Sequence, residues 1–307
     1  MLRRNFIQQG SLLSGGLALA SLGRANKHFF TTDDNNTPFR LDYAFHEGMF
    51  KQHAGPQFTN EIRFAHQQGF RSIEDNGMMG RSAKEQEDIG QLLRELGMRM
   101  GVFVITSDNW HWQTSLATGK KEWKDKMETD CRRAIEVAAR TGAKWMTVVP
   151  GNYDRSQSLA MQTAHVIDAL RRGASILEPH GLVMVLEPLS DNPDLFLRFS
   201  DQTYAICKAV NSPSCKILYD AYHMQRNEGN IIQNIDRCWD EIAYIQTGDN
   251  PGRKEPGTGE MNYRNIFRHL HQKGYKGILG MEHGLSKQGK EGELALIKAY
   301  RDADDFL

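Results

Sequence analysis

The sequence predicts a single (β/α)₈ barrel, an α/β fold in which eight parallel strands are each followed by a helix. From residue 41 onward, short apolar runs alternate with longer amphipathic stretches. The alternation repeats eight times in a chain of 307 residues, which is a usual size for this barrel. The apolar runs are nearly continuous, as in parallel strands that helices cover. Residues 41–307 are therefore expected to form one domain.

The strands are expected at eight places along the chain. They are residues 41–48, 70–77, 98–106, 144–151, 182–188, 216–220, 242–249 and 277–283. Helical patterns fill the gaps, and several of them, such as DIGQLLRELG and CRRAIEVAARTG, end near a glycine, which is a common helix stop. A doubly wound sheet is the alternative. It normally has a glycine-rich phosphate-binding turn after its first strand, and this sequence has none there.

Residues 1–25 are expected to form an export signal rather than part of the barrel. Arg3 and Arg4 precede the short apolar run SLLSGGLALASLG, and GRA, ending at Ala25, offers small residues for cleavage. The arginine pair makes the segment resemble a twin-arginine leader, which predicts a periplasmic or otherwise exported protein. If the leader is not used, the protein is cytoplasmic. An uncleaved anchor or a fortuitous basic start are the alternatives.

The segment after the leader, residues 26–40, is polar and turn-rich and is expected to be a linker. The apolar run of the leader is too short to span a bilayer comfortably, so no stable membrane insertion is expected after processing.

The charged residues balance: Lys+Arg and Asp+Glu number 38 each. This balance argues against nucleic acid or an anionic membrane as a partner and favours a small molecule in a pocket.

The four cysteines have no C-x-x-C spacing, so a structural zinc site is not indicated. They are Cys131, Cys207, Cys215 and Cys238. Cys207 and Cys215 could form a disulfide in an oxidising compartment. The alternative is four buried thiols.

Polar side chains stand at the C-terminal ends of six predicted strands, where the functional residues of such barrels gather. In chain order they are His46, Glu74, Glu187, Asp220, Gln246 and Glu282. The last three carboxylates would repel one another in one pocket unless some are protonated or a cation lies between them. Those carboxylates and the Gln246 amide offer oxygen ligands that suit one divalent ion, Mg²⁺ or Mn²⁺ better than Zn²⁺ or Co²⁺.

Each of these residues also has a structural explanation. Asp220 could cap the helix that follows its strand, and Glu187 and Glu282 could each pair with an arginine. His223, three residues after Asp220, could touch what the metal binds or could be a hydrogen-bonded core histidine. The pattern over four successive strands favours a site. The two residues at the ends of the first two strands stay open between a structural role and substrate binding.

Three segments in about the last third of the chain carry specific motifs. They are ILYDAYHMQRNEGNIIQNI, IAYIQTGDNPGRKEPGTGEMNYRNIF and GYKGILGMEHG, in this order, and MVLEPLS extends the pattern back to the fifth strand. These segments resemble hydroxypyruvate isomerases, which belong to the wider xylose-isomerase-like TIM barrel superfamily of sugar isomerases and epimerases. The N-terminal half resembles this family mainly in its alternation of predicted strands and helices.

The resemblance implies a metal-dependent isomerase. Its metal ligands fall on Glu187, Asp220, Gln246 and Glu282. Glu187 and Glu282 are implied as the acid/base pair, and His223 and Arg253 as contacts to substrate oxygens. The implied reaction interconverts hydroxypyruvate and tartronate semialdehyde, or a similar small hydroxy-carbonyl compound, by proton transfer through a metal-bound enediolate. Arg253 could instead form a surface ion pair with Glu255.

Two features depart from the resemblance and bear on the substrate. Hydroxypyruvate isomerases typically lack an export leader. In the loop SDNWHWQ, the residues Trp110, His111 and Trp112 could form an aromatic lid over a sugar ring, with Trp112 a candidate substrate contact, or an ordinary surface loop. The alternative function is therefore a ketose 3-epimerase or keto-sugar lyase acting on an exported sugar. Glu260, in GTGEMNY, is expected to be structural or to lie behind the site.

Two hypotheses from other functional classes remain, a nuclease and a sugar-binding protein. A nuclease of the endonuclease IV type would need several strand-end histidines for a multi-zinc centre and a basic groove. Gln246 stands where such a histidine would be, and the net charge is +0. A non-catalytic exported sugar-binding protein would bind ligand without exchanging its C–H protons. A homo-oligomer is possible in every case.

Overall fold

The computed structural model describes residues 37–307. The predicted leader, residues 1–25, and the predicted linker up to residue 36 lie outside the described residues and stay predictions. Within residues 37–307, no helix is both long enough and apolar enough to cross a membrane.

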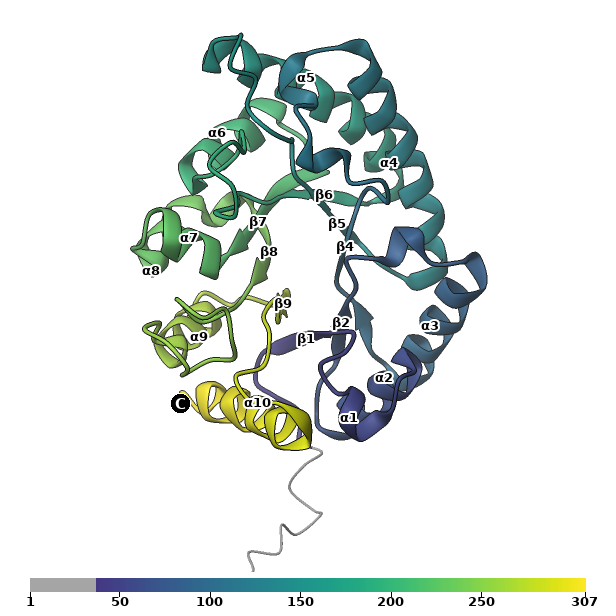
Figure 1. Ribbon diagram of the computed structural model, residues 1–307, viewed down its shortest axis with the longest axis vertical. Helices are drawn as coiled ribbons and strands as arrows, with labels where there is room; N and C mark the ends of the chain where they lie inside the picture. Colours follow the sequence, from purple (N-terminus) through teal and green to yellow (C-terminus); the bar gives the residue numbers. More distant parts are fainter. Residues whose placement is uncertain (1–36) are drawn as a thin grey trace, which may run out of the picture. The chain divides into compact units, whose positions relative to one another are not determined.

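The strands form a nearly closed parallel barrel, as predicted (Figure 1). They are β1 (Asp42–His46), β2 (Ser72–Glu74), β3 (Arg99–Met100), β4 (Val102–Val104), β5 (Trp145–Val148), β6 (Val183–Leu186), β7 (Cys215–Asp220), β8 (Ile242–Gln246) and β9 (Ile278–Gly280). Their order in the sheet is β3-β2-β1-β9-β8-β7-β6-β5-β4. Because β3 and β4 are consecutive in the chain, this order returns to its starting point and describes a ring.

The predicted third strand, residues 98–106, is in fact two short strands that meet at Gly101. β3 pairs with β2, and β4 pairs with β5. Gly101 lies close to other groups on the inside of the ring. A Cβ atom there would be 2.3 Å from the Tyr244 hydroxyl and 2.9 Å from the carbonyl oxygen of Ile73. The break therefore lies where the backbone makes room for a large interior side chain, which the local sequence does not reveal.

The helices lie outside the strands, one or two after each barrel position (Figure 1). They are α1 (Lys51–Ala54), α2 (Phe58–Gln67), α3 (Ala83–Leu96), α4 (Lys121–Thr141), α5 (Leu159–Leu177), α6 (Ser200–Val210), α7 (Ala221–Asn227), α8 (Ile231–Cys238), α9 (Tyr263–Gln272) and α10 (Gly289–Asp304). Short 3₁₀ turns occur at Met78–Gly80, Trp110–Trp112, Leu116–Thr118, Glu178–His180 and Trp239–Glu241. α3 shows how the sequence sets its ends: Ser82 and Glu85 form a capping box, and Gly97 ends the helix in the left-handed conformation.

Two apolar layers hold the barrel together. The larger one lies between strands and helices, and a smaller one fills the inside of the ring. The inner layer consists of Ala44, Val102, Val183, Val185, Leu218, Tyr244 and Ile278. At the C-terminal end of the ring polar side chains take its place, with a small apolar cluster of Val149, Leu189 and Leu195 beside them. The apolar layers therefore provide a rigid support for a polar mouth.

The four cysteines are buried and free. Of the two expectations, a Cys207–Cys215 disulfide and four buried thiols, the second is confirmed. The neighbouring Cys215 sulfur and burial raise the pKa of Cys207 well above its usual value, so it stays a thiol.

Substitution of Gly101 by alanine should destabilise the barrel, because the new methyl group would collide with Tyr244 and with β2. We expect a loss of about 1–3 kcal/mol in the free energy of unfolding, typical of overpacking. Gly80→Ala is the matched control, since a Cβ atom there has nothing within 4 Å and the backbone is not left-handed. Urea unfolding of both variants measures the difference. Equal stabilities would contradict this explanation of the split strand.

Candidate active site

Three of the predicted carboxylates come together at the C-terminal end of the barrel. Glu187 directly follows β6, Asp220 is the last residue of β7, and Glu282 lies just beyond β9. His223 joins them from the first turn of α7. Each of the four offers one ligand atom, and these atoms all lie within 4.8 Å of one another. Glu187, Asp220 and His223 are buried, whereas Glu282 is partly exposed.

The two carboxylate oxygens of Asp220 have separate partners. Oδ1 accepts hydrogen bonds from the backbone N–H of Tyr222 at 2.7 Å and of His223 at 3.4 Å, which caps α7. Oδ2 lies 3.2 Å from Nη2 of Arg253. Asp220 therefore has both expected roles: one oxygen caps the helix, and the other belongs to the carboxylate cluster. The cap fixes the direction in which the second oxygen points.

Arg253 is the positive charge of the cluster. Its Nη2 donates to Glu282 Oε2 at 2.9 Å as well as to Asp220, and its Nε donates to the backbone carbonyl of Glu282 at 3.0 Å. Its guanidinium carbon lies 4.9 Å from the centre of the Tyr222 ring. The alternative of a surface ion pair with Glu255 is wrong. Glu255 is buried and accepts a hydrogen bond from the backbone N–H of Ser286 at 2.9 Å.

The single positive charge of Arg253 does not balance the negative charges of the carboxylates around it. Burial, followed by the negative charges of Glu282 and Asp220, raises the pKa of Glu187 well above its usual value. Burial also raises the pKa of Asp220, against the opposing effect of Arg253. The site therefore holds more negative charge than its own residues neutralise, which is the condition that a bound cation relieves.

Gln246 is the last residue of β8 and pairs with Asp220 of β7 in the sheet. Of its two amide atoms, the nitrogen has a hydrogen-bond partner and the oxygen has none among the described residues. Its Nε2 donates to Glu74 Oε2 at 3.1 Å. Among the described residues, its Oε1 is buried without a hydrogen-bond partner, as is Oε1 of Glu187. Leaving a buried polar atom unpaired costs about 1–3 kcal/mol. The free oxygens, together with the carboxylates, fit the oxygen ligand set expected for a divalent ion.

His223 is placed as a hydrogen-bond donor. The backbone N–H of Ser190 donates to its Nδ1 at 3.2 Å, so in the neutral ring the hydrogen is on Nε2. Burial and the charge of Arg253 lower the pKa of His223 to about 4, so the ring is neutral at neutral pH. Its Nε2 lies 3.5 Å from Asp220 Oδ2. A protonated Nε2 suits the predicted contact to a substrate oxygen better than metal ligation.

His46 and Glu74, the strand-end residues of β1 and β2, form a polar layer under the cluster. His46 Nε2 lies 2.5 Å from Glu74 Oε2. Burial alone would lower the pKa of His46, but the carboxylates of Glu74, Glu282 and Asp75 together outweigh burial and raise the pKa. A Cβ atom at Gly280 would lie 1.8 Å from Glu74 Oε1, so this carboxylate fills the space that a side chain on β9 would take. Their predicted substrate contact has no support here, because neither residue lines the cavity described next.

A cavity of about 400 Å³ opens above the cluster. It is lined by Asn76, Gly77, Val104, Thr106, Asn109, His111, Trp112, Thr147, Val149, Glu187, Leu189, Asp191, His223, Arg253 and Glu282. The carboxylates, His223 and Arg253 form one wall. The ends of β4 and β5 and the loop after β4 line the part beside it, since the backbone N–H of Glu187 donates to the carbonyl of Val148 on β5 at 3.2 Å. The cavity therefore joins the predicted reaction centre to uncharged side chains, some polar, such as Thr106 and Thr147, and some apolar, such as Val104 and Val149.

The predicted aromatic lid is only partly formed. Trp112 is 43% exposed and lines the cavity, and His111 lines it from a buried position. Trp110 instead points into the core, is 2% exposed, and donates to Asp130 Oδ2 at 2.8 Å. The two tryptophans of the loop thus have different roles, one structural and one at the cavity.

Asp249 positions the loop that carries Arg253, and the sequence analysis missed it. Its buried carboxylate accepts hydrogen bonds from the backbone N–H groups of Gly257 at 2.8 Å, Gly259 at 2.9 Å and Met261 at 3.0 Å. Its carbonyl accepts from the backbone N–H of Arg253 at 2.7 Å. Asp249 thereby ties the loop of Arg253 to the G-E-x-N-Y segment. Its position at the end of the predicted strand 242–249, in G-D-N-P-G, could have indicated this role.

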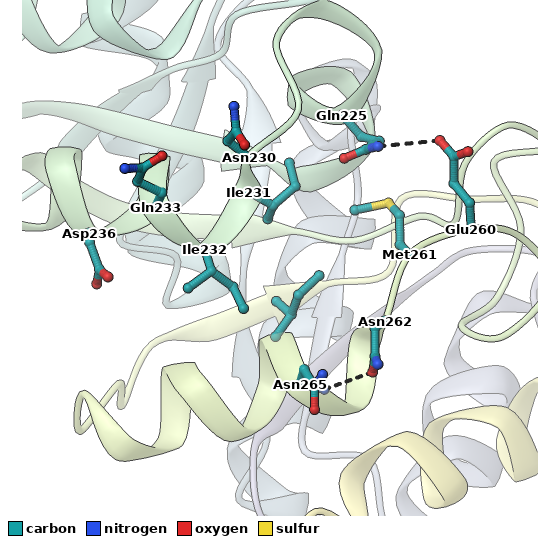
Figure 2. A pocket seen from close by; sticks show the side chains of 11 residues that line it. Gln225, Asn230, Ile231, Ile232, Gln233, Asp236, Glu260, Met261, Asn262 and Asn265 are labelled. Carbon is teal, nitrogen blue, oxygen red and sulfur yellow. Dashed lines mark hydrogen bonds between the residues drawn. The ribbon is translucent and has the colours of Figure 1, made fainter.

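A second cavity, of about 580 Å³, lies between α8 and the start of α9 (Figure 2). Glu260 faces it and accepts a hydrogen bond from Gln225 Nε2 at 3.3 Å. The other lining residues are Asn230, Ile231, Ile232, Gln233, Asp236, Met261, Asn262, Asn265 and Ile266. None of the predicted catalytic, metal or substrate residues lines it. The expected structural role of Glu260, outside the reaction centre, agrees with this position.

Comparison with known proteins identifies the family. The model of a family described as a xylose isomerase-like TIM barrel matches residues 62–302, which is more than half of the chain. The chain belongs to the xylose isomerase-like TIM barrel family. The superfamily expected from the C-terminal motifs is thus confirmed.

Relatives in this family carry the names of isomerases. The hydroxypyruvate isomerase of Escherichia coli (strain K12) is 33% identical over 152 residues, which are 49% of this chain and 59% of that protein. The 2-oxo-tetronate isomerase of Cupriavidus necator is 28% identical over 260 residues, 82% of this chain and 95% of that protein. The resemblance to hydroxypyruvate isomerases and the expected enzyme class, an isomerase, are confirmed by these relatives.

Solved structures with the same fold have varied names. One is an AP endonuclease of family 2 from Brucella melitensis, with a TM-score of 0.72, 20% identity, and coverage of 82% of this chain and 96% of that one. Another is a 3-keto-D-glucoside 4-epimerase from Escherichia coli, with a TM-score of 0.71, 18% identity, and coverage of 86% and 99%. At these identities the likeness establishes the fold alone.

A divalent ion should stabilise the chelator-treated protein by binding the carboxylate cluster. At a free ion concentration one hundred times the Kd, binding adds about 2.7 kcal/mol to the free energy of unfolding. We expect a higher Tm with Mn²⁺ or Mg²⁺ for the wild type and little change for Glu187→Gln. Glu291→Gln, at an exposed carboxylate of α10, is the matched control and should keep the wild-type response. The same Tm shift in all three proteins would show that the ion binds elsewhere.

Proposed function

We propose that the protein is a divalent-metal-dependent isomerase of small hydroxy-keto compounds, of the hydroxypyruvate isomerase type. Relatives named for hydroxypyruvate and for 2-oxo-tetronate support an isomerase of small hydroxy-keto acids. The observation that carries the proposal is the cluster of Glu187, Asp220 and Glu282 around a single guanidinium at the mouth of the barrel. Such a cluster suits an ion and a substrate that chelates it.

The metal ligands in this proposal are the ones expected from the sequence. They are Glu187, Asp220, Gln246 and Glu282. When bound, a divalent ion of the Mg²⁺ or Mn²⁺ type supplies Lewis-acid polarisation of a substrate carbonyl, which makes the neighbouring C–H group more acidic. The unpaired Oε1 atoms of Glu187 and Gln246 support this assignment.

The proton transfers are assigned to two glutamates. Glu187, in the drier position, removes the proton from the carbon next to the carbonyl. Glu282 is held by Asn76, whose Nδ2 donates to its Oε1 at 3.0 Å, and by Arg253. Either Glu282 or Glu187 returns the proton at the neighbouring carbon. A proton moved between these carbons, together with transfer of the hydroxyl proton to the former carbonyl oxygen, interconverts the ketone and aldehyde forms.

Two further residues orient the substrate. His223 donates from Nε2 to a substrate oxygen, because its Nδ1 is already occupied by the backbone N–H of Ser190. Arg253 binds a carboxylate or hydroxyl of the substrate once a metal ion shares the charge of Asp220 and Glu282. The packing of its guanidinium on Tyr222 keeps it at the edge of the cavity during this exchange.

A ketose 3-epimerase or keto-sugar lyase is the second candidate function. The same glutamates perform the epimerisation if the proton returns to the original carbon from the opposite face. The observation that favours it is the size of the cavity, together with its uncharged lining at the ends of β4 and β5. The substrate panel below separates these reactions.

For the rest of the chain we propose, from the sequence alone, export through the twin-arginine-like leader and no nucleic-acid partner. Replacement of Arg3 and Arg4 by lysine should retain the full chain in the cytoplasm, because paired arginines mark this type of leader. Fractionation of cells that express either chain measures the difference. An unchanged distribution would count against the leader.

The homo-oligomer stays a prediction. Sedimentation of the purified protein measures it directly.

Exchange of substrate C–H protons in D₂O tests the isomerase directly. Chelator-treated protein is reloaded with Mg²⁺, Mn²⁺, Co²⁺ or Zn²⁺ and followed by NMR with hydroxypyruvate and with ketoses of four to six carbons. We expect deuterium at the carbon next to the carbonyl only with metal. Glu187→Gln and Glu282→Gln should lower the exchange rate by about 10²-fold or more, the usual contribution of an acid/base group.

The control for this experiment is the exposed Glu291→Gln variant, which should exchange at the wild-type rate. The product distinguishes an isomerase from an epimerase. Tight metal binding without exchange of any substrate would remove the isomerase proposal and favour a sugar-binding protein or a lyase.

A further inference from the structure

Two of the strand-end residues have no part in the proposed reaction. Glu74 ends β2 and His46 ends β1, and neither residue lines the cavity above the carboxylate cluster. Glu74 is 0% exposed, so its carboxylate is completely removed from solvent. A buried carboxylate is costly unless polar partners compensate it. The partners that Glu74 has connect it to the expected metal ligands.

One oxygen of Glu74 has two polar neighbours, and the other oxygen fills a gap in the sheet. Oε2 accepts a hydrogen bond from Nε2 of Gln246 at 3.1 Å, and Nε2 of His46 lies 2.5 Å from the same oxygen. Oε1 lies where a Cβ atom of Gly280 would be 1.8 Å away. Gly280 pairs with Gln246, and β1 and β9 separate Glu74 from β8 in the sheet. The missing side chain on β9 therefore opens the path by which Glu74 reaches the amide.

This hydrogen bond sets the orientation of the Gln246 amide. A side-chain amide has a donating nitrogen and an accepting oxygen, and half a turn about its last bond exchanges the two. An ionised carboxylate accepts hydrogen bonds and has none to donate. The nitrogen therefore faces Glu74, which leaves Oε1 of Gln246 buried and without a partner among the described residues. A divalent ion of the Mg²⁺ type binds oxygen ligands, so the opposite orientation would remove one ligand.

We propose that Glu74 is a positioning residue that holds the Gln246 amide with its oxygen ready for the divalent ion, and that His46 holds Glu74 in turn. Loss of such a supporting partner typically weakens metal binding by about 10–100-fold. The proposal rests on the proposed function for the ion and for Gln246 as its ligand. It gives the two strand-end residues a role in metal affinity that requires no contact with the ion or the substrate.

The test measures Mn²⁺ binding to the chelator-treated protein by the electron paramagnetic resonance signal of the free ion, which requires no turnover. Glu74→Gln keeps the shape of the side chain but can turn either an oxygen or an NH₂ group towards Gln246. The Gln246 amide then has no fixed orientation, and we expect the Kd for Mn²⁺ to rise about tenfold.

Glu293→Gln is the matched control for this substitution. Glu293, on α10, is also a buried glutamate beside a histidine, with its Oε2 2.5 Å from Nδ1 of His53. It does not line the cavity above the carboxylate cluster. Its replacement should therefore leave the Kd for Mn²⁺ at the wild-type value.

The same substitution in a Gln246→Glu background separates orientation from general support. The glutamate that replaces Gln246 has oxygen at both ends, so its orientation no longer matters. Glu74→Gln should then leave the Kd unchanged or lower it, because it also removes a like charge beside the new carboxylate. An equal loss of affinity in both backgrounds would show that Glu74 acts only through packing and would overturn the proposal. An unchanged Kd in the Gln246 protein would overturn it as well.

A measurement on the wild type decides the question if Glu74→Gln fails to fold. The side-chain amide signal of Gln246 is identified in NMR spectra by its loss in Gln246→Glu. We expect nuclear Overhauser contacts between the N–H hydrogens of Gln246 and the side-chain hydrogens of Glu74, both without and with Mg²⁺. Absence of these contacts, or their loss when Mg²⁺ binds, would show that the amide is not held in advance and would overturn the proposal.

The combined results separate this proposal from the proposed reaction. Mn²⁺ affinity that depends on Glu74 only when residue 246 is glutamine, in a protein that exchanges no substrate proton, would support the positioning role and reject the isomerase. Mn²⁺ affinity independent of Glu74, in a protein that exchanges substrate protons, would reject the positioning role and leave the isomerase. A wild type that binds no Mn²⁺ would overturn both.

Discussion

The mutual repulsion of carboxylates in the mouth of the barrel is the constraint to which the surrounding structure responds. At an effective dielectric constant of 20, two like charges 4 Å apart repel by about 4 kcal/mol. Glu187, Asp220 and Glu282 place such groups within 4.8 Å of one another. A fold with this arrangement needs counter-charges, hydrogen-bond donors or protons at fixed places. Most of the polar contacts around the site supply one of these.

The supporting groups come from different parts of the chain and act on different carboxylates. The first turn of α7 turns its N–H groups towards one oxygen of Asp220. The loop that Asp249 organises presents Arg253 to Asp220 and Glu282 together. Among the described residues, Oε1 of Glu187 has no hydrogen-bond partner, and burial raises the pKa of this carboxylate well above its usual range. This asymmetry gives chemically similar side chains different tasks, with the least supported one best suited to take up a proton.

The fold and the centre of the site were predictable because they depend on patterns that are local in sequence. The alternation of strands and helices identified the barrel, and the strand ends identified Glu187, Asp220 and Glu282, because parallel strands bring their ends to one rim. What the sequence did not reveal depends on contacts between distant residues. The break at Gly101 arises from Tyr244, far along the chain. The separate fates of Trp110 and Trp112 depend on Asp130, which accepts from only one of them.

The contacts of Glu74 have a consequence for how the molecule assembles. This side chain on β2 contacts His46 on β1 and Gln246 on β8, and it fills the space left by Gly280 on β9. Glu74 and Gln246 are 172 residues apart in sequence, and such non-local pairings form late in folding because a long loop must close first. The amide that the site needs is therefore oriented only when β2 and β8 have come together on either side of β1 and β9. An incompletely closed ring lacks this orientation, so ligand affinity itself reports the final step of folding.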